Sequence, residues 1–284
     1  MKRLAAWMLA LTMLAASMPA VAEEEEEFSI ADFCDVIWED EVELEDVTWD
    51  FPVALTDMDP MYVVLANKTM LLDKTFVPDP LVTMKARKTD KAGNNTNGGV
   101  RKASSSEMKL QGTCAEALTA MFEGAEQDGI LLYLKSAYRS WQTQNTMYYN
   151  RLKKNKGKDD GWVSKPGASD HQTGLGCDIV SKAWRDKAMN GNFGKTEEAK
   201  WMAAHCHEYG FILRYPSDKE ELTEINYEPW HFRYVGIPAA TYIMKNGLCL
   251  EEFADQLNAA IAAYIANGGD ESLVKPFMQV SAEY

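Results

Sequence analysis

The spacing of apolar residues along the chain predicts several helices. From Met108 to Ala125 apolar side chains recur every three or four positions, which is the period of a helix with one buried face, and Gly129 stops the pattern. Pro238 suits the first turn of a later helix, because proline has no N–H to offer there. The expected helices span residues 108–125, 141–154, 196–209, 239–246 and 251–266.

Short apolar runs between these helices predict strands at residues 62–65, 130–134, 177–180, 211–213 and 230–235. In the last run the two-residue period of a strand sends His231, Arg233 and Val235 to one face, so His231 points away from the aromatic residues on the other face. Strands separated by helices of mixed length favour an α+β fold. We expect a small antiparallel sheet flanked by helices.

The first residues have the order of a secretory signal peptide. Lys2 and Arg3 precede an apolar run from Leu4 to about Met18, and residues 20–22 read Ala-Val-Ala. The run is short of the roughly 20 residues that a membrane-spanning helix needs, and no other stretch approaches that length. We therefore expect a secreted, extracytoplasmic protein without a transmembrane helix once residues 1–22 are removed.

Acidic residues are concentrated near the N-terminus. The formal net charge of the chain is −14, and residues 23–55 hold fourteen acidic residues and no basic one. The run from Glu23 to Glu27 is most simply a solvated spacer, whereas Trp49 and Phe51 belong to an apolar pattern that can dock on the domain. The expected organisation is a signal peptide (1–22), an acidic arm (23–55), one domain (56–253) and a C-terminal helix with a tail (254–284). No basic patch or glycine-rich phosphate loop is present, so nucleic-acid binding is not expected.

One stretch carries the pattern of a metal site. Residues 169–178 read Ser-Asp-His-Gln-Thr-Gly-Leu-Gly-Cys-Asp, with Gly174 and Gly176 between His171 and Asp178. The glycines permit a sharp turn after His171, and the strand that follows can return Asp178 towards it. The sequence therefore predicts that the imidazole and the carboxylate meet.

A second stretch supplies another histidine and another acid. Pro229 excludes a helix interior and favours an extended conformation at Glu228, so Glu228 and His231 do not form the helical His-Glu-x-x-His arrangement. Two imidazoles and one carboxylate leave a fourth position open on zinc, where a bound water has a pKa of roughly 7. Glu228 is the natural base for that water.

At these residues the chain resembles a known family. The pattern Ser-x-His-x-x-Gly-x-x-x-Asp followed by Glu-x-x-His is similar to that of the zinc D-alanyl-D-alanine carboxypeptidases of the VanY type. The likeness extends over roughly residues 60–253, with further blocks in the family's order at residues 67–68, 136–140, 211–216 and 228–236. Ala137, Asp170 and the pair Gly176-Cys177 depart from the family pattern, which affects the expected shape of the pocket but not the metal.

The resemblance implies a role for each candidate residue. His171, Asp178 and His231 would bind one zinc ion per chain, and Glu228 would be the catalytic base. Arg139 would meet the carboxylate of the substrate, which a guanidinium matches with two parallel N–H donors. Four further residues fall where related enzymes line the substrate pocket: Gln144, Ser169, Tyr215 and Trp230.

The resemblance also implies an activity. The expected protein is a zinc metallopeptidase of the cell wall, a hydrolase that removes the terminal D-alanine from peptidoglycan stem peptides. The sequence does not separate this activity from that of an L,D-carboxypeptidase or a D,D-dipeptidase of the same family. Two histidines and a carboxylate also describe a non-haem iron oxygenase, but Glu228 and export argue against it. The intact ligand set argues against a wall-binding module without catalysis.

The five cysteines permit up to two disulfides in an exported chain. Cys177 alternates with Asp178 and so faces away from the metal, where the helix that carries Cys206 can cover it. A bond between Cys177 and Cys206 and two small buried thiols are both open at this point.

Overall fold

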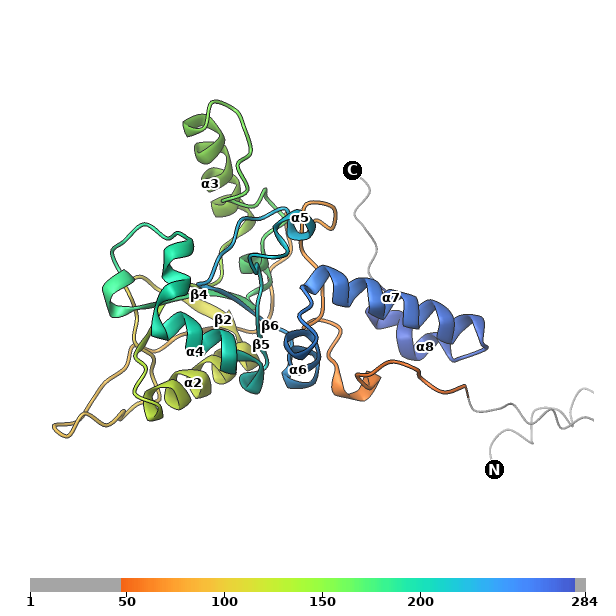
Figure 1. Cartoon of the computed structure of the whole chain (residues 1–284), viewed down its shortest axis with the longest axis horizontal. Helices are drawn as coiled ribbons and strands as arrows, with labels where there is room; N and C mark the ends of the chain where they lie inside the picture. Colours follow the sequence, from red (N-terminus) through yellow and green to blue (C-terminus); the bar gives the residue numbers. More distant parts are fainter. Residues whose placement is uncertain (1–46, 279–284) are drawn as a thin grey trace, which may run out of the picture. The chain divides into compact units, whose positions relative to one another are not determined.

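The computed structural model describes residues 47–278, so the predicted signal peptide and most of the acidic arm lie outside the described residues. The helices and strands confirm an α+β fold (Figure 1). The strands are β1 (Leu81–Thr83), β2 (Lys109–Gln111), β3 (Leu132–Ser136), β4 (Gly176–Ser181), β5 (Phe211–Leu213) and β6 (His231–Tyr234). The α-helices are α2 (Gly112–Gln127), α3 (Trp141–Lys154), α4 (Glu197–His205), α5 (Glu220–Thr223), α6 (Ile237–Lys245), α7 (Leu250–Ala266) and α8 (Glu271–Val274).

Four of the strands form one antiparallel sheet in the order β3-β4-β6-β5. Across this sheet Asp178 on β4 lies opposite His231 on β6 and opposite Ser136 on β3. Strands β1 and β2 form a separate antiparallel pair. The central position of β4 therefore brings Asp178 between the two strands that lead to Arg139 and His231.

The predicted helices are present, but the first begins at Gly112 and not at residue 108, because Lys109–Gln111 form strand β2; local caps account for several of the helix starts. Ser140 accepts a hydrogen bond from the backbone N–H of Thr143 at the start of α3, and Thr196 accepts one from Ala199 at the start of α4. Pro238 lies in the first turn of α6, as predicted. In α2 the residues at helical spacing are buried: Cys114, Ala115, Leu118, Met121, Phe122 and Ala125.

The strand predicted at residues 62–65 is wrong, because this segment forms turns and irregular backbone. The carbonyl oxygens of Tyr62 and Val64 accept hydrogen bonds from the Arg233 guanidinium. The backbone of this apolar run is therefore held by a buried arginine from a distant part of the chain. The sequence of the run itself does not show this contact. The predicted helix at 196–209 is confirmed to His205, after which residues Cys206–Tyr209 form a 3-10 turn.

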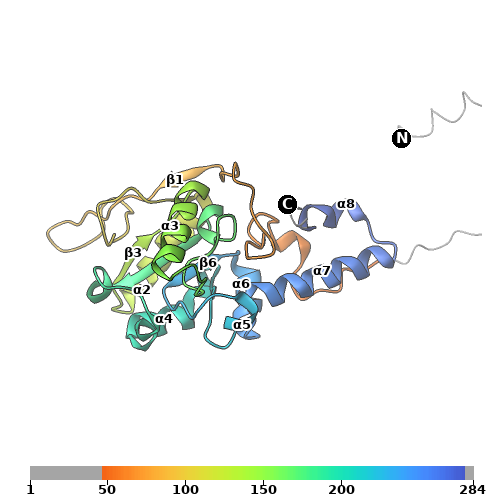
Figure 2. The same ribbon diagram turned by 90° about the horizontal axis from the view of Figure 1, so that it is seen from above.

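Two hydrophobic cores support the sheet. One lies among α2, α4 and the strands, and includes Leu118, Phe193 and Phe232. The second includes Val53, Phe253 and Leu257 and joins α6, α7 and α8 to the start of the described chain. Trp49 and Phe51, predicted to dock, pack edge-on with Tyr264 and Phe253 respectively. Figures 1 and 2 both show α7 running out beyond α6, on the side of the sheet away from α2 and α4.

Four cysteines lie within the described residues, and all are buried free thiols: Cys114, Cys177, Cys206 and Cys249. The possible bond between Cys177 and Cys206 is therefore absent, and these two residues fill the core as small apolar side chains. Among the described residues, no helix has the length and apolar character needed to cross a membrane.

Candidate metal centre

The turn after His171 has the form that its glycines predict. His171 lies in a 3-10 turn (Asp170–Thr173), and Gly174 follows with a φ of 69°, a left-handed conformation that favours glycine. The chain then enters β4, which carries Asp178 back beside His171. Burial of every residue of β4 holds this return in one place.

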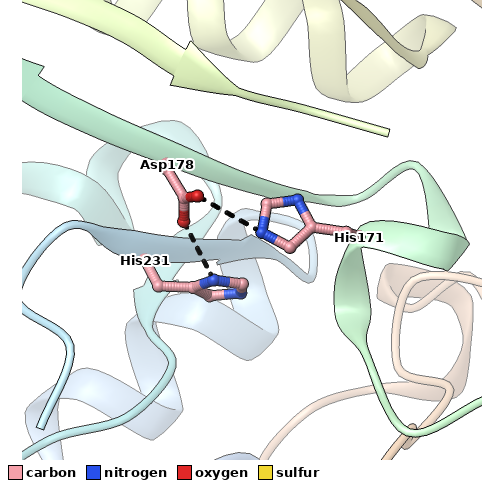
Figure 3. A group of neighbouring side chains, drawn as sticks. All are labelled: His171, Asp178 and His231. Carbon is pink, nitrogen blue, oxygen red and sulfur yellow. Dashed lines mark ion pairs between the residues drawn. The ribbon is translucent and has the colours of Figure 1, made fainter. Parts of the chain in front are cut away.

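His171, Asp178 and His231 converge on one point. Asp178 Oδ2 lies 3.5 Å from His171 Nε2, and Asp178 Oδ1 lies 3.2 Å from His231 Nδ1. Figure 3 shows the carboxylate pointing at both imidazole rings, which come from separate parts of the chain. The three ligand atoms lie within 4.8 Å of one another, and all three side chains are buried.

The hydrogen bond made by His171 fits a cation at this point. Its Nδ1 lies 2.7 Å from the carbonyl oxygen of Ala137, which can only accept, so Nδ1 carries the proton. Burial and the nearby Arg139 lower the pKa of His171, which favours the neutral ring. Nε2 then presents a lone pair to the Asp178 carboxylate. Two such acceptors facing each other fit a metal ion between them.

Glu228 lies beside this group but is not one of its three members. The chain is pinned on both sides of Pro229, since Glu228 N–H donates to Tyr215 and His231 N–H donates to the Glu228 carbonyl. Glu228 Oε2 lies 3.7 Å from His231 Nδ1. Burial and the charge of Asp178 raise the pKa of Glu228 well above its ordinary value, although Arg139 opposes the shift. This is the environment of a carboxyl group that exchanges protons.

Arg139 follows β3 and is held by two side chains. Its Nη1 donates to Gln144 Oε1 at 2.6 Å, and its Nη2 donates to Ser136 Oγ at 3.4 Å. Its backbone N–H donates to the carbonyl of His171 at 3.0 Å, which ties it to the metal ligand. Gln144 Nε2 donates to the Ser164 carbonyl at 2.6 Å. Both ends of the Gln144 amide are therefore engaged, and they orient Arg139.

The structure brings the nine predicted residues together in one pocket of about 310 Å³. Ser169 and Tyr215 are buried in its wall, and the Tyr215 ring lies 5.0 Å from the His231 ring. Trp230 stacks on Trp162, with ring centroids 6.2 Å apart and planes inclined by 16°. The remaining members of the predicted set also line it: Arg139, Gln144, His171, Asp178, Glu228 and His231.

Sequence reasoning missed several residues that line the pocket: Met147, Arg151, Trp162, Val163, Ser164 and Met189. Trp162 stands alone as an aromatic residue in a polar, glycine-containing loop, and that isolation was a usable signal. Met147 lies on the predicted helix at 141–154 and is 39% exposed, so nothing in its local pattern distinguishes it from a surface residue.

A group of buried charges supports the metal ligands from behind. We call it the arginine cluster: Asp170, Arg214, Arg233 and Glu251. Asp170 accepts from Arg214 Nε at 2.7 Å and from Arg233 Nη1, and Arg214 binds both oxygens of Glu251. Asp170 Oδ2 also lies 3.9 Å from His231 Nε2.

The chain is similar to known carboxypeptidases. Residues 107–237 match the model of the family VanY, described as D-alanyl-D-alanine carboxypeptidase. The YodJ protein of Bacillus subtilis (strain 168) is 42% identical over 144 residues, which cover 50% of this chain and 52% of that protein. The bifunctional D-Ala-D-Ala dipeptidase and carboxypeptidase VanXYC of Enterococcus gallinarum is 37% identical over 143 residues, which cover 50% of this chain and 74% of that one.

Two solved structures are similar over a longer part of the chain. The LD-carboxypeptidase LdcB has a TM-score of 0.59 and 34% identity, and the match covers 69% of this chain and 87% of that one. A mutant of the vancomycin-resistance D,D-pentapeptidase VanY in complex with Zn(II) has a TM-score of 0.50 and 29% identity, with 68% and 98% covered. The match spans about half the length of YodJ and of the Enterococcus faecalis D-alanyl-D-alanine carboxypeptidase.

Proposed function

Because this chain belongs to the VanY family of D-alanyl-D-alanine carboxypeptidases, we propose that it is a zinc-dependent carboxypeptidase. Its proposed substrates are peptidoglycan stem peptides, from which it removes the terminal D-alanine. The signal-peptide pattern of residues 1–22 supports action outside the cytoplasm, at the cell wall. One zinc ion per chain is proposed, held by His171, Asp178 and His231.

The observation that carries this proposal is the placement of five side chains in one pocket: His171, Asp178, His231, Glu228 and Arg139. Two imidazole nitrogens and a carboxylate converge there, next to a carboxyl group of raised pKa and an oriented guanidinium. A hydrolase that acts on a free peptide terminus needs each of these groups. An iron oxygenase needs neither Glu228 nor Arg139 at its metal.

The side chains divide the work of hydrolysis. Arg139 binds the terminal carboxylate of the peptide with two parallel N–H bonds, and Gln144 keeps the guanidinium in position. Glu228 accepts a proton from the attacking water and returns it to the leaving amine. Zinc bound by two imidazoles and one carboxylate supplies a Lewis acid, which polarises a carbonyl and lowers the pKa of a water ligand to roughly 7. Trp162 and Trp230 form an apolar wall of the pocket.

Two related activities compete with the leading one. LdcB is an LD-carboxypeptidase, and VanXYC is named as a dipeptidase as well as a carboxypeptidase. The proposed zinc ion and the Glu228 base would serve either type of reaction, so the side chains around the metal do not distinguish them.

The products decide among these activities. Zinc-loaded protein is incubated with a pentapeptide stem ending in D-Ala-D-Ala, with a tetrapeptide stem, and with D-Ala-D-Ala alone, and the products are weighed by mass spectrometry. We expect loss of one D-alanine from the pentapeptide. Cleavage confined to the tetrapeptide would assign an L,D-carboxypeptidase, and cleavage confined to the dipeptide a dipeptidase. No cleavage of any of the three by zinc-loaded protein would contradict the proposal.

A further inference from the structure

Lys135 occupies a position that hydrolysis itself does not require. It lies on β3, one residue before Ser136, which pairs with Asp178 across the sheet. Its ammonium nitrogen donates to three backbone carbonyl oxygens of a single segment, those of Trp184 (3.2 Å), Arg185 (3.0 Å) and Lys187 (2.9 Å). A lysine ammonium has three N–H donors and no acceptor, so each donor has a partner.

The three carbonyls belong to residues 182–190, which we call the wall segment. This segment follows β4 directly, and its residue Met189 lines the pocket. Two further contacts attach its first half: the Arg185 guanidinium lies 5.4 Å from the centre of the Tyr133 ring, and Trp184 packs edge-on against Phe193 at 5.5 Å. The ammonium of Lys135 binds the carbonyls of the two residues that make these contacts, Trp184 and Arg185, and the carbonyl of Lys187, two positions before Met189.

The residues that follow Lys135 serve the same pocket. The carbonyl of Ala137 fixes the ring of His171, and the hydroxyl of Ser136 accepts a bond from Arg139. One short stretch of chain therefore positions a metal ligand, the arginine that meets the substrate and the wall segment. The first two connections account for catalysis, and the third has no part in it.

We propose that Lys135 is a positioning residue for substrate selection: by binding three carbonyls it holds the wall segment so that Met189 forms a fixed apolar side of the pocket. This inference rests on the proposed carboxypeptidase function. Within the described residues, Lys135 makes no hydrogen bond to a metal ligand or to Glu228, and it acts on Asp178 only through the electrostatic attraction of its charge. Loss of the ammonium should therefore weaken peptide binding and leave the metal and the proton transfer in place.

The decisive variant is Lys135→Met, which keeps the length of the side chain and removes its donors. We expect KM for the stem peptide to rise by about tenfold while kcat stays within about twofold, since the lost contact acts equally on bound substrate and transition state. Zinc content should not change. The matched control is Lys182→Met in the same segment, where the lysine is exposed, and its kinetic constants should equal those of the wild type.

A double-mutant cycle tests whether Lys135 acts through Met189. Met189→Ala should raise KM by a similar factor, and the double variant should be no worse than either single one, because both remove the same side of the pocket. Additive effects on KM would overturn the inference. If Lys135→Met does not yield folded protein, Lys135→Arg serves instead, because a planar guanidinium cannot meet three converging carbonyls and should still raise KM.

Hydrogen exchange separates this inference from the proposed function. In Lys135→Met the backbone amides of residues 182–190 should exchange faster than in the wild type, while those of β4 should not change. This measurement needs no substrate, so it reports the stability of the wall segment even if no stem peptide is cleaved. Faster exchange with an unchanged KM, or unchanged exchange, would each contradict the role of Lys135.

Discussion

Two groups of buried charged side chains lie beside His231: the arginine cluster, and the pocket carboxyl groups of Asp178 and Glu228. They differ in how many of their polar atoms have hydrogen-bond partners. In the arginine cluster each carboxylate oxygen of Asp170 and Glu251 accepts from a guanidinium. In the pocket, by contrast, Asp178 Oδ1 makes no hydrogen bond within the described residues although it lies 3.2 Å from His231 Nδ1, and the pKa of Glu228 is raised. Buried charges that satisfy one another stabilise a conformation, whereas buried groups left without partners await a ligand.

The largest expected effect comes from removing a metal ligand. His231→Ala deletes one of three converging donors, and the remaining imidazole and carboxylate cannot hold zinc tightly. We expect the purified variant to lose its zinc and its hydrolytic activity, as measured by elemental analysis and product release. His205→Ala is the control, because His205 is a half-buried residue at the end of α4 that pairs with Glu208 and does not line the pocket. Equal zinc content in the two variants would show that the metal lies elsewhere.

Glu228→Gln should separate proton transfer from metal binding. Glu228 is not needed to complete the set of two histidines and one aspartate, so the variant should keep zinc and still bind peptide. Its rate of hydrolysis should fall by about a hundredfold to ten-thousandfold, the range for loss of a general base. Asp178→Asn should instead hold zinc weakly and regain some activity in excess zinc. If Glu228→Gln loses zinc while Asp178→Asn retains it, the two carboxylates have been assigned in reverse.

The two halves of the metal site were predictable from local patterns in the sequence, whereas four residues of the pocket wall were predicted only from the resemblance to the VanY family: Gln144, Ser169, Tyr215 and Trp230. Two glycines between His171 and Asp178 permit the sharp turn that brings this pair together, and Pro229 restricts the backbone between Glu228 and His231. The longer helices and the four strands of the main sheet followed from the spacing of apolar residues and from the glycines and prolines beside them, whereas β1, β2, α5 and α8 were not predicted. These patterns need no knowledge of distant contacts.

The arginine cluster was not predictable by the same means. The strand period placed Arg233 on the face of His231, but its partner Asp170 lies 63 positions earlier in the chain. A charged residue in a strand usually indicates a surface position, so its burial is a property of the tertiary fold. The contacts of Lys135 were even harder to predict from the sequence. Its partners are backbone carbonyls, and every residue has one.

Breaking the arginine cluster should cost stability. Arg233→Met removes a donor to Asp170 and the donors to the carbonyls of Tyr62 and Val64, and leaves polar groups buried without partners. We expect the free energy of unfolding to fall by about 3–5 kcal/mol in urea titrations. The control is Arg151→Met, since Arg151 pairs with Asp160 at a partly exposed site and should lose no more than about 1 kcal/mol. Similar losses of unfolding free energy in Arg233→Met and Arg151→Met would show that the buried and the partly exposed ion pairs contribute equally to stability.

The smallest expected effect tests how the pocket reads the end of its substrate. Arg139 donates from Nη1 to Gln144 and from Nη2 to Ser136, which fixes the plane of the guanidinium towards the pocket. Arg139→Lys keeps the positive charge but replaces a planar pair of donors with a single ammonium, which cannot bind a carboxylate at two points. We expect kcat/KM for peptides with a free terminal carboxylate to fall by about tenfold to a hundredfold, the loss expected when charge-assisted hydrogen bonds worth about 1.5–3 kcal/mol are weakened. Amidation of the peptide terminus removes the group that Arg139 binds, so it should reduce turnover by the wild type more than turnover by the variant.

Arg151→Lys is the matched control, because Arg151 also lines the pocket but binds Asp160. In this variant the ratio of kcat/KM for free peptides to kcat/KM for amidated peptides should stay at its wild-type value. Equal sensitivity to amidation in wild type and Arg139→Lys would show that a different group holds the terminus, and that the orientation given by Gln144 serves the fold rather than the substrate.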